Sequence, residues 1–530
     1  MSNQFRLMVK FKPESVVSVK EGKINFSNKE EVIKTANYIF NFSYRHVIHF
    51  LSDTGECINT QNGIDFSQYK GLVYVENTEG MSEGDLELLA ESFQALPYVE
   101  YAYVENIMPI APPSVESHVD LIADTGGDNN FTENEPPDIS EFSNTPDFIN
   151  RQDYLRGQGP QGQIGIEADY AWRLNVLGQG IRCADIEWSF NFNHEDLVGP
   201  NFIPVLPTTN TRFNDHGAAV ASVIMARNNG FGLLGANYGL DAFYGVSELT
   251  RGRVNGIAEG LLRLRAGDVF LYEMQTGGRL VTRPNGVTEP ELITPDFDRG
   301  VWDITRTATN AGVIVIATAG NGAGDLDHPY YNAFRNRGDN GIIRLGAGTR
   351  IGRHRASFST FGSPIHVQGW GDWSVTSAGY GALFNAGPNR NYTHTFSGTS
   401  AAGPIVAAAA IAIQSWYKAR FQRVLAPRAM RDLLISTGTP QGTGGHIGPL
   451  PNIRRAIAAL NVTPTYPLWR RGVVYVAGNR VSWNNNNWQA SWWTQNVEPG
   501  TREPNGGFPW RQLSAANASE VPPLSDDAML

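Results

Sequence analysis

The middle of the chain alternates between apolar runs typical of buried strands and runs of small residues typical of buried helices. Val313–Ala319 predicts a buried strand that ends at an asparagine between two glycines. Ile181–Ile186 follows a glycine turn and predicts a second strand that ends at a carboxylate. The small residues after His216 and the nine-residue apolar run Ile405–Ile413 predict helices that cross a sheet. The pattern favours an α/β core with polar residues at the ends of its elements.

The first hundred residues show a separate pattern, and their composition differs from that of the rest of the chain. Phe5–Phe11 alternates as a strand does, and Pro97–Glu105 predicts a second strand. Between them, Ser82 begins a capping motif before apolar residues at helical spacing. Seven of the eight lysines lie at or before Lys70. We therefore expect a small α/β module over residues 1–110.

A segment rich in Pro, Asp, Asn, Ser and Gly follows this module and predicts an exposed linker over residues 111–160. The main domain is then expected over residues 161–460. The last residues, 514–530, are polar and contain proline, so we expect them to be disordered.

Four polar residues at predicted strand and helix ends have the types that acyl transfer needs. Ser400 opens the long apolar helix, whose N-terminus offers backbone N–H groups to developing negative charge, although a serine there could equally be a simple N-cap. His216 opens the helix of small residues, and Glu187 and Asn321 end strands. Together they supply a nucleophile, a general base, an acid that orients the base and an amide for an oxyanion.

These motifs occur in the order acid, histidine, asparagine, serine, and they resemble the motifs of the subtilisin family of serine peptidases. The resemblance implies a subtilisin-like α/β fold, with a parallel sheet and helices on both faces. It also implies a catalytic triad of Glu187, His216 and Ser400. Asn321 and the Ser400 backbone N–H would then hold the oxyanion.

The acid of this triad departs from the family pattern, which carries aspartate where this chain has Glu187. The spacing to His194, which opens the segment after the first motif, argues against a misalignment. Asp185 lies two residues earlier and shares a face of the strand, so it stays open as the alternative acid. The longer side chain also leaves open a site that is weakened or inactive.

The resemblance assigns further roles in the main domain. Gln275, Thr276, Gly277 and Gly278 match the family's substrate-binding strand, whose backbone pairs with an extended peptide. Catalysis in this family needs no cofactor. Asp196 matches a position that binds structural calcium in family members, so a calcium ion is possible here.

The C-terminal end predicts a second binding function. Half of the twelve tryptophans fall between Trp469 and Trp510, and so short a segment cannot bury them all. Residues 467–513, with the run Ala-Ser-Trp-Trp-Thr-Gln, resemble the small all-β chitin- and cellulose-binding module of chitinases, although a tryptophan-rich mini-core would share the pattern. Exposed aromatic rings offer platforms for sugar rings. The candidates for sugar contact are Tyr475, Trp492, Trp493 and Trp510.

The N-terminal module resembles the inhibitory propeptide of subtilisins, a small ferredoxin-like domain that chaperones folding and blocks the cleft. Both ends therefore predict a secreted endopeptidase, made as a zymogen, inhibited by its own propeptide and tethered to chitin or a similar β-1,4-glycan. No secretory signal peptide is visible after Met1. The alternative is a catalytically weakened or dead carbohydrate-binding scaffold.

Composition limits the classes of partner that we expect. A formal net charge of −10 argues against nucleic acid. Two cysteines, Cys57 and Cys183, do not make a disulfide framework. No apolar run has the length of a membrane span, so we expect no membrane partner. We expect a monomer that acts on proteins or peptides.

Overall fold

The computed structural model describes residues 5–49, 51–52, 64–106, 144–208, 210–211, 213–284, 286–461, 466–467, 469–483, 486–503 and 506–513. The chain divides into two compact units, Met1–Ile453 and Arg454–Leu530. The predicted disordered tail and most of the predicted linker lie outside the described residues.

The N-terminal part of the first unit is a four-stranded antiparallel sheet in the order β4-β5-β1-β6, with helices between its strands. Ser82 and Asp85 form the predicted capping box at the start of the second helix. This confirms a small α/β module. Its elements are β1 (Phe5–Phe11), η1 (Pro13–Ser15), β2 (Val16–Lys20), β3 (Lys23–Phe26), α1 (Lys29–Ala36), η2 (Asn37–Asn41), β4 (Ser43–His46), η3 (Ser67–Tyr69), β5 (Leu72–Glu76), α2 (Glu83–Gln94) and β6 (Val99–Asn106).

The main domain is built on a seven-stranded sheet in the order β15-β14-β13-β10-β7-β9-β8, in which every neighbouring pair is parallel. Its central strands are continuous apolar runs, as in sheets covered on both faces. This confirms the predicted α/β fold. The strands are β7 (Arg182–Glu187), β8 (Phe202–Pro204), β9 (Ala242–Ser247), β10 (Val269–Tyr272), β13 (Ile314–Thr318), β14 (Ile343–Gly348) and β15 (Val367–Trp370).

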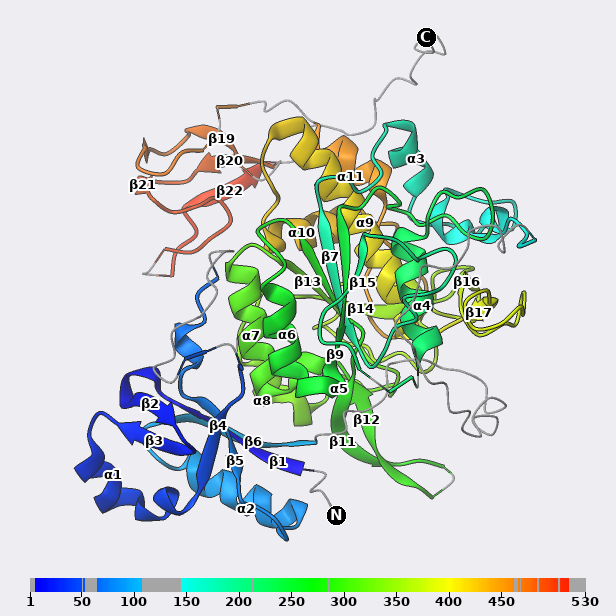
Figure 1. Ribbon diagram of the computed structural model, residues 1–530. Coiled ribbons are helices and arrows are strands. Elements are labelled where there is room, and N and C mark those ends of the chain that lie inside the picture. Colours follow the sequence, from blue (N-terminus) through cyan, green and yellow to red (C-terminus); the bar gives the residue numbers. More distant parts are fainter. Residues whose placement is uncertain are drawn as a thin grey trace. The chain divides into compact units, whose positions relative to one another are not determined.

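Helices cover both faces of this sheet (Figure 1). On one face, α6 (Arg253–Leu261) and α7 (Arg299–Asn310) share a core with Ala184 and Ile186 of β7. Since side chains alternate along a strand, the odd-numbered residues of β7 face the other side, where α4 (Asn214–Met225) packs against α9 (Thr399–Phe421).

The helix α9 (Thr399–Phe421) contains the predicted apolar run and crosses strands β10, β13, β14 and β15. Among the described residues it alone has the length and composition of a membrane span, and 94% of that window is buried inside the protein. It is therefore placed as the core helix of the main domain.

Shorter elements connect this core. The hairpin of β11 (Thr276–Thr282) and β12 (Thr288–Ile293) and the pair of β16 (Val375–Ala378) and β17 (Tyr392–Phe396) form separate two-stranded sheets. The remaining elements are η6 (Ile149–Arg151), η7 (Asp153–Leu155), α3 (Ala168–Arg173), α5 (Glu248–Arg251), η8 (Pro295–Phe297), η9 (Pro329–Tyr331), α8 (Asn332–Arg335), α10 (Pro427–Thr437) and α11 (Ile453–Leu460).

The end of the predicted linker belongs to the main domain. Tyr154 is fully buried, and its hydroxyl donates to the Thr376 carbonyl at 2.7 Å. Phe148 packs against Tyr392 with ring centroids 5.1 Å apart. The linker prediction is therefore wrong for residues 144–160, because a few aromatic anchors fix a segment whose composition is otherwise polar.

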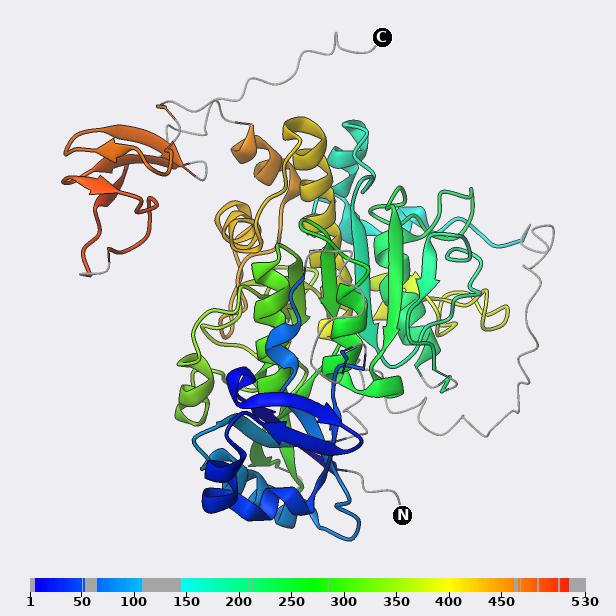
Figure 2. The same ribbon diagram turned by 60° about the vertical axis from the view of Figure 1, so that its left-hand side comes forward.

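The C-terminal unit contains short strands, drawn from orange to red in Figure 2. β18 (Val474–Tyr475) pairs with β21 (Thr494–Gln495), and β20 (Asn486–Ala490) lies between β19 (Arg480–Trp483) and β22 (Trp510–Leu513). The small core contains Trp469, Tyr475, Val481, Ala490 and Trp510. From Trp469 to Leu513 this unit is therefore all-β around a small aromatic core.

Candidate active site and carbohydrate-binding module

The structure brings together the first two residues of the predicted triad. Glu187 ends β7 and His216 lies in the first turn of α4. His216 Nδ1 and Glu187 Oε2 are 2.7 Å apart, and neither side chain has exposed surface. Burial raises the pKa of Glu187 well above its ordinary value. A carboxylate on Nδ1 orients the ring so that Nε2 can act as the base.

The predicted nucleophile stands in the first turn of α9. Gly398, the residue at its N-cap, has φ of 88°, a backbone region that favours glycine. Ser400 is buried, and its Oγ forms no hydrogen bond of normal geometry with the described residues. The His216 ring contacts Phe396, just before this turn, with centroids 5.7 Å apart. The base and the nucleophile thus lie in the same region of the site.

The side-chain amide of Asn321, the predicted oxyanion donor, is held in one orientation. Its Oδ1 accepts hydrogen bonds from the Thr399 N–H and from Thr399 Oγ1, both at 3.0 Å. Because the amide oxygen is held in this way, the Nδ2 group points elsewhere, and it is buried with no partner among the described residues. An unpaired buried N–H group beside the nucleophile is what a developing oxyanion requires.

The residues predicted to bind substrate lie at the start of β11, with Gln275 just before it. Gln275 Oε1 accepts from the Asn321 N–H at 3.1 Å, and Thr276 Oγ1 donates to Asp298. Gly277 pairs with β12, and Gly278 approaches the Tyr331 hydroxyl so closely that a side chain would clash. β11 has β12 as its one neighbour among the described strands. The binding role of Gln275, Thr276, Gly277 and Gly278 stays a prediction.

Asp185 lies on the same face of β7 as Glu187, and its carboxyl is fully buried. The carboxyl oxygen that lies 2.7 Å from His216 Nδ1 belongs to Glu187. The geometry therefore favours Glu187 over Asp185 as the triad acid. Sequence reasoning missed Glu273, the residue after β10, whose side chain is also fully buried. A glutamate at the end of an apolar strand was the available signal.

Asp196, the possible calcium ligand, is buried between N–H donors. Its Oδ1 accepts from Asn229 Nδ2 at 2.9 Å and its Oδ2 from the Leu233 N–H at 2.8 Å. Burial raises the pKa of Asp196 to about 7. Calcium needs a shell of oxygen ligands, and these N–H groups do not provide one. Among the described residues no group of His, Cys, Asp and Glu side chains is arranged to hold a metal ion. As arranged, these residues do not fit a calcium ion.

The C-terminal unit exposes some of its aromatic rings and buries others. Trp492 is 43% exposed and Trp493 is 59% exposed, as predicted for sugar platforms. Tyr475 and Trp510 are buried and pack on each other with centroids 5.1 Å apart, so their prediction as sugar contacts is wrong. They form the core that a small module needs. Phe508, 49% exposed, was missed because the tryptophans dominated the pattern.

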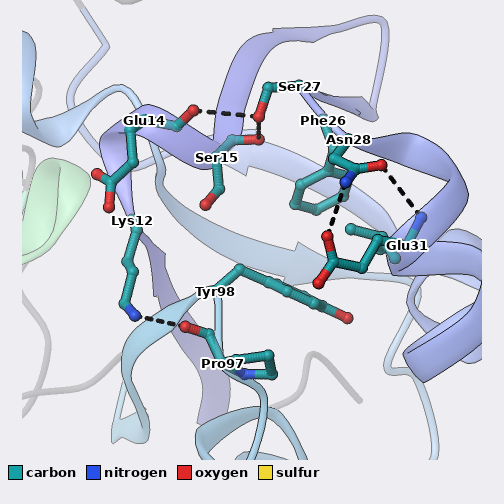
Figure 3. Close-up of a pocket in the computed structure, with 10 residues that line it drawn as sticks. Lys12, Glu14, Ser15, Phe26, Ser27, Asn28, Glu31, Pro97 and Tyr98 are labelled. Carbon is teal, nitrogen blue, oxygen red and sulfur yellow. Dashed lines mark hydrogen bonds between the residues drawn. The ribbon is translucent and has the colours of Figure 1, made fainter.

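A pocket of about 250 Å³ lies in the N-terminal module and is lined by residues including Lys12, Glu31 and Tyr98 (Figure 3). Beside it, Asn28 caps α1 by accepting from the Glu31 N–H and donating to the Glu31 carboxylate. The residues around this pocket include no member of the triad. It is therefore separate from the candidate active site.

Comparisons with known proteins find similar chains. Alkaline elastase YaB from Bacillus sp. (strain YaB) is 30% identical over 264 residues, which are 48% of this chain and 60% of that protein. Subtilisin Savinase from Lederbergia lenta is 29% identical over 264 residues, 84% of its length. A solved protease structure from Pseudoalteromonas arctica PAMC 21717 is 20% identical, with a TM-score of 0.43, and covers 60% of this chain and 99% of that chain.

Two family descriptions match the chain. Carbohydrate-binding module family 5/12 matches residues 468–511, the C-terminal unit with the exposed tryptophans. The subtilase family matches residues 122–449, which is more than half of the chain and includes Glu187, His216, Asn321 and Ser400. The chain therefore belongs to the subtilase family.

Proposed function

We propose that this chain is a serine endopeptidase that cleaves proteins through Ser400, His216 and Glu187. The observation that carries the proposal is the 2.7 Å contact between His216 Nδ1 and Glu187 Oε2, because it shows that glutamate reaches the base. This contact supports the peptidase over the inactive-scaffold alternative, which was motivated by the unusual acid. His216 accepts the Ser400 proton during attack and returns it to the leaving amine.

The activity is tested with a fluorophosphonate, which forms a bond only with an activated serine hydroxyl. Mass spectrometry of the labelled chain is expected to place the modification on Ser400, and casein is expected to be degraded before labelling but not after it. Labelling of another serine, or casein degradation that survives full labelling of Ser400, contradicts the proposal.

The Asn321 amide is expected to lower the barrier by holding the oxyanion. Replacing Asn321 by leucine removes the Nδ2 donor and should reduce kcat by about 10²- to 10³-fold with little change in KM, the loss known from the corresponding donor of subtilisin. Steady-state kinetics on a peptide substrate measure both constants.

The matched control is Thr399→Val, which removes one of the two bonds to Asn321 Oδ1 and keeps the backbone N–H that makes the other. This variant is expected to lose only a few-fold in kcat, about the worth of one neutral hydrogen bond. Equal kcat values for Asn321→Leu and the wild type would exclude an oxyanion role for Asn321.

We further propose that the N-terminal module is an inhibitory propeptide. Its sheet packs on α6 and α7, where Met8, Tyr69 and Tyr101 share a core with the helices. Lys10, 2% exposed, forms ion pairs with Asp303 of α7 and with Glu100. A buried Lys–Asp pair is costly unless both partners are held, so it favours one docking arrangement. A folding aid and inhibitor needs this kind of specific contact.

The C-terminal unit is proposed to bind chitin or a related β-1,4-glycan through Trp492, Trp493 and Phe508. Binding to an insoluble glycan would raise the local concentration of the peptidase on proteins in that matrix. Because such a matrix lies outside the cell, the enzyme is proposed to act there.

Removing the Trp493 ring should weaken binding to chitin beads by about 3- to 10-fold, the worth of one aromatic contact. The full-length chain with Ser400→Ala is used as background, so that self-digestion does not release the unit. Val476→Ala, at a residue that is 49% exposed in the same unit, is the control and should bind as before. Equal binding by the Trp493→Ala chain, or no retention of either chain on chitin, cellulose or starch, contradicts the glycan proposal.

A further inference from the structure

Three carboxyl side chains, one of them the proposed triad acid Glu187, lie on one face of the sheet. β7 and β10 are parallel neighbours with Ile186 opposite Tyr272, and the Glu273 N–H donates to the Ile186 carbonyl at 3.1 Å. Since side chains alternate, Glu273 lies on the same face as Asp185 and Glu187. Their opposite neighbours Ile186 and Tyr272 pack in the core with α6 and α7. The three carboxyls therefore face α9.

These carboxyls are buried without a strong base to neutralise them. Asp185, Glu187 and Glu273 are each 0% exposed. Both oxygens of Asp185, both of Glu273 and Oε1 of Glu187 have no hydrogen-bond partner among the described residues. No lysine or arginine of the described residues forms an ion pair with any of the three. Of the six carboxyl oxygens of the cluster, five thus have no partner, and the sixth, Glu187 Oε2, contacts His216, which can carry a positive charge.

α9 is shaped to receive the Glu273 carboxyl. A Cβ atom at Gly403 would lie 1.8 Å from Glu273 Oε1, so only glycine fits at this position. Gly403 and Ser400 are three residues apart and share a face of the helix. The Ser400 hydroxyl lies close enough to lower the pKa of Glu273, against the larger effect of burial, although it makes no hydrogen bond of normal geometry. The carboxyl is therefore placed beside the nucleophile.

Three carboxylates in such a space cannot all be ionised, because each charge loses its water and repels the others. Burial and the charge of Glu187 both raise the pKa of Asp185 well above its ordinary value. Burial raises the pKa of Glu273 as well, and the charges of Asp185 and Glu187 raise it further. Glu187 is in contact with His216, so the negative charge of the cluster is best placed on Glu187.

Other titratable groups face the cluster from neighbouring elements. Cys183 lies on the same face of β7, and its thiol is kept neutral because burial raises its pKa. Glu248 of α5 repels Glu187 but is itself paired with Arg253 at 2.6 Å. None of these groups supplies an uncompensated positive charge to the carboxyls.

We propose that Asp185 is a positioning residue that remains a neutral carboxylic acid and donates a hydrogen bond to Glu187, with Glu273 as a second neutral acid beside Ser400. This rests on the proposed peptidase function. The donated hydrogen bond holds Glu187 in the ionised form that orients His216. The Asp185 hydroxyl thereby supplies the donor that the second oxygen of a triad carboxylate needs. Loss of the Asp185 proton at high pH would put two negative charges together and disturb that orientation.

The test compares Asp185→Asn with Asp185→Val in the full-length chain. Asparagine keeps a donor and has no proton to lose, so this variant should stay within a few-fold of wild-type kcat and retain activity at pH values where the wild type declines. Valine removes the donor and should lose about 10- to 100-fold in kcat, the worth of a hydrogen bond to a charged group. Glu273→Gln is also expected to move the alkaline limb of the kcat/KM profile upward. Equal losses for asparagine and valine, or an unmoved limb in both amide variants, overturn the proposal.

A second measurement does not depend on activity. Infrared difference spectra at neutral pH should show the carbonyl stretch of a protonated carboxylic acid in the wild type, reduced in Asp185→Asn and in Glu273→Gln. Asp296→Asn is the control: burial favours the neutral form of this acid, but Arg344 lowers its pKa below the ordinary value, so no such band should disappear. If no band is lost in either amide variant, the proposal fails. If the bands are lost while Ser400 stays unlabelled, the peptidase function alone fails.

Discussion

A full-length chain with Ser400→Ala is expected to keep its mass on prolonged incubation, whereas the wild type loses its N-terminal module. The serine hydroxyl is the proposed nucleophile, and its loss should reduce kcat on peptides by about 10⁶-fold, a magnitude known from subtilisin. Mass spectrometry over time and hydrolysis of casein measure the two effects. The cut is expected within residues 107–143, after the N-terminal module and before residues 144–160, which belong to the main domain.

The control for this comparison is the double variant Ser400→Ala with His216→Ala. Triad residues act as a unit, so the second substitution should add almost nothing to the first. The peptidase and zymogen proposals would both be contradicted by a wild-type chain that stays full length and does not cleave casein, even after a trace of activating protease has been added. Loss of the N-terminal module from the alanine variant at the wild-type rate would show that another protease removes it.

Sequence patterns predicted the α/β core and the order of the triad residues, because each lies at the end of a strongly apolar strand or helix. Ser400, His216 and Glu187 stand at such ends in the structure, and Asn321 follows the end of β13 in the next loop. The choice between Glu187 and Asp185 stayed open in the sequence, since residues two apart on a strand share a face. Only the position of α4 relative to β7 decides which carboxyl reaches the base.

Other features depend on contacts between distant segments, which a single sequence does not show. Glu273 lies on the same face of the sheet as Asp185 because of the register in which β10 pairs with β7. Residues 144–160 have the composition of a linker, yet Tyr154 is buried against β16. In the C-terminal unit a tryptophan count predicts that some rings are exposed, but the pairing of β20 with β22 places Trp510 in the core.

Shortening or neutralising the triad acid is the second change with a large expected effect. Glu187→Gln keeps the shape of the side chain and removes its charge, so it no longer stabilises the imidazolium or selects the correct His216 tautomer. The expected loss in kcat is about 10⁴-fold, as for the equivalent change in other triads. Glu187→Asp keeps the charge but withdraws the carboxylate from its 2.7 Å contact. A displacement of about 1 Å costs about a hundredfold in rate.

Comparing the activities of Glu187→Gln and Glu187→Asp separates the effect of the carboxylate's charge from the effect of its position. Aspartate is the usual acid of the family, so a chain whose strand could accept either residue would show Glu187→Asp at wild-type activity. We expect it to be impaired instead, because β7 and α4 are spaced for the longer side chain and Asp185, further from His216, does not take over. Burst kinetics with a chromogenic ester give the acylation rate of each variant. Labelling each variant with the fluorophosphonate and locating the modified residue by mass spectrometry checks that Ser400 is still the nucleophile. An aspartate variant as fast as the wild type would mean that the site adjusts to the shorter acid, and that the glutamate is not what sets the geometry of the triad.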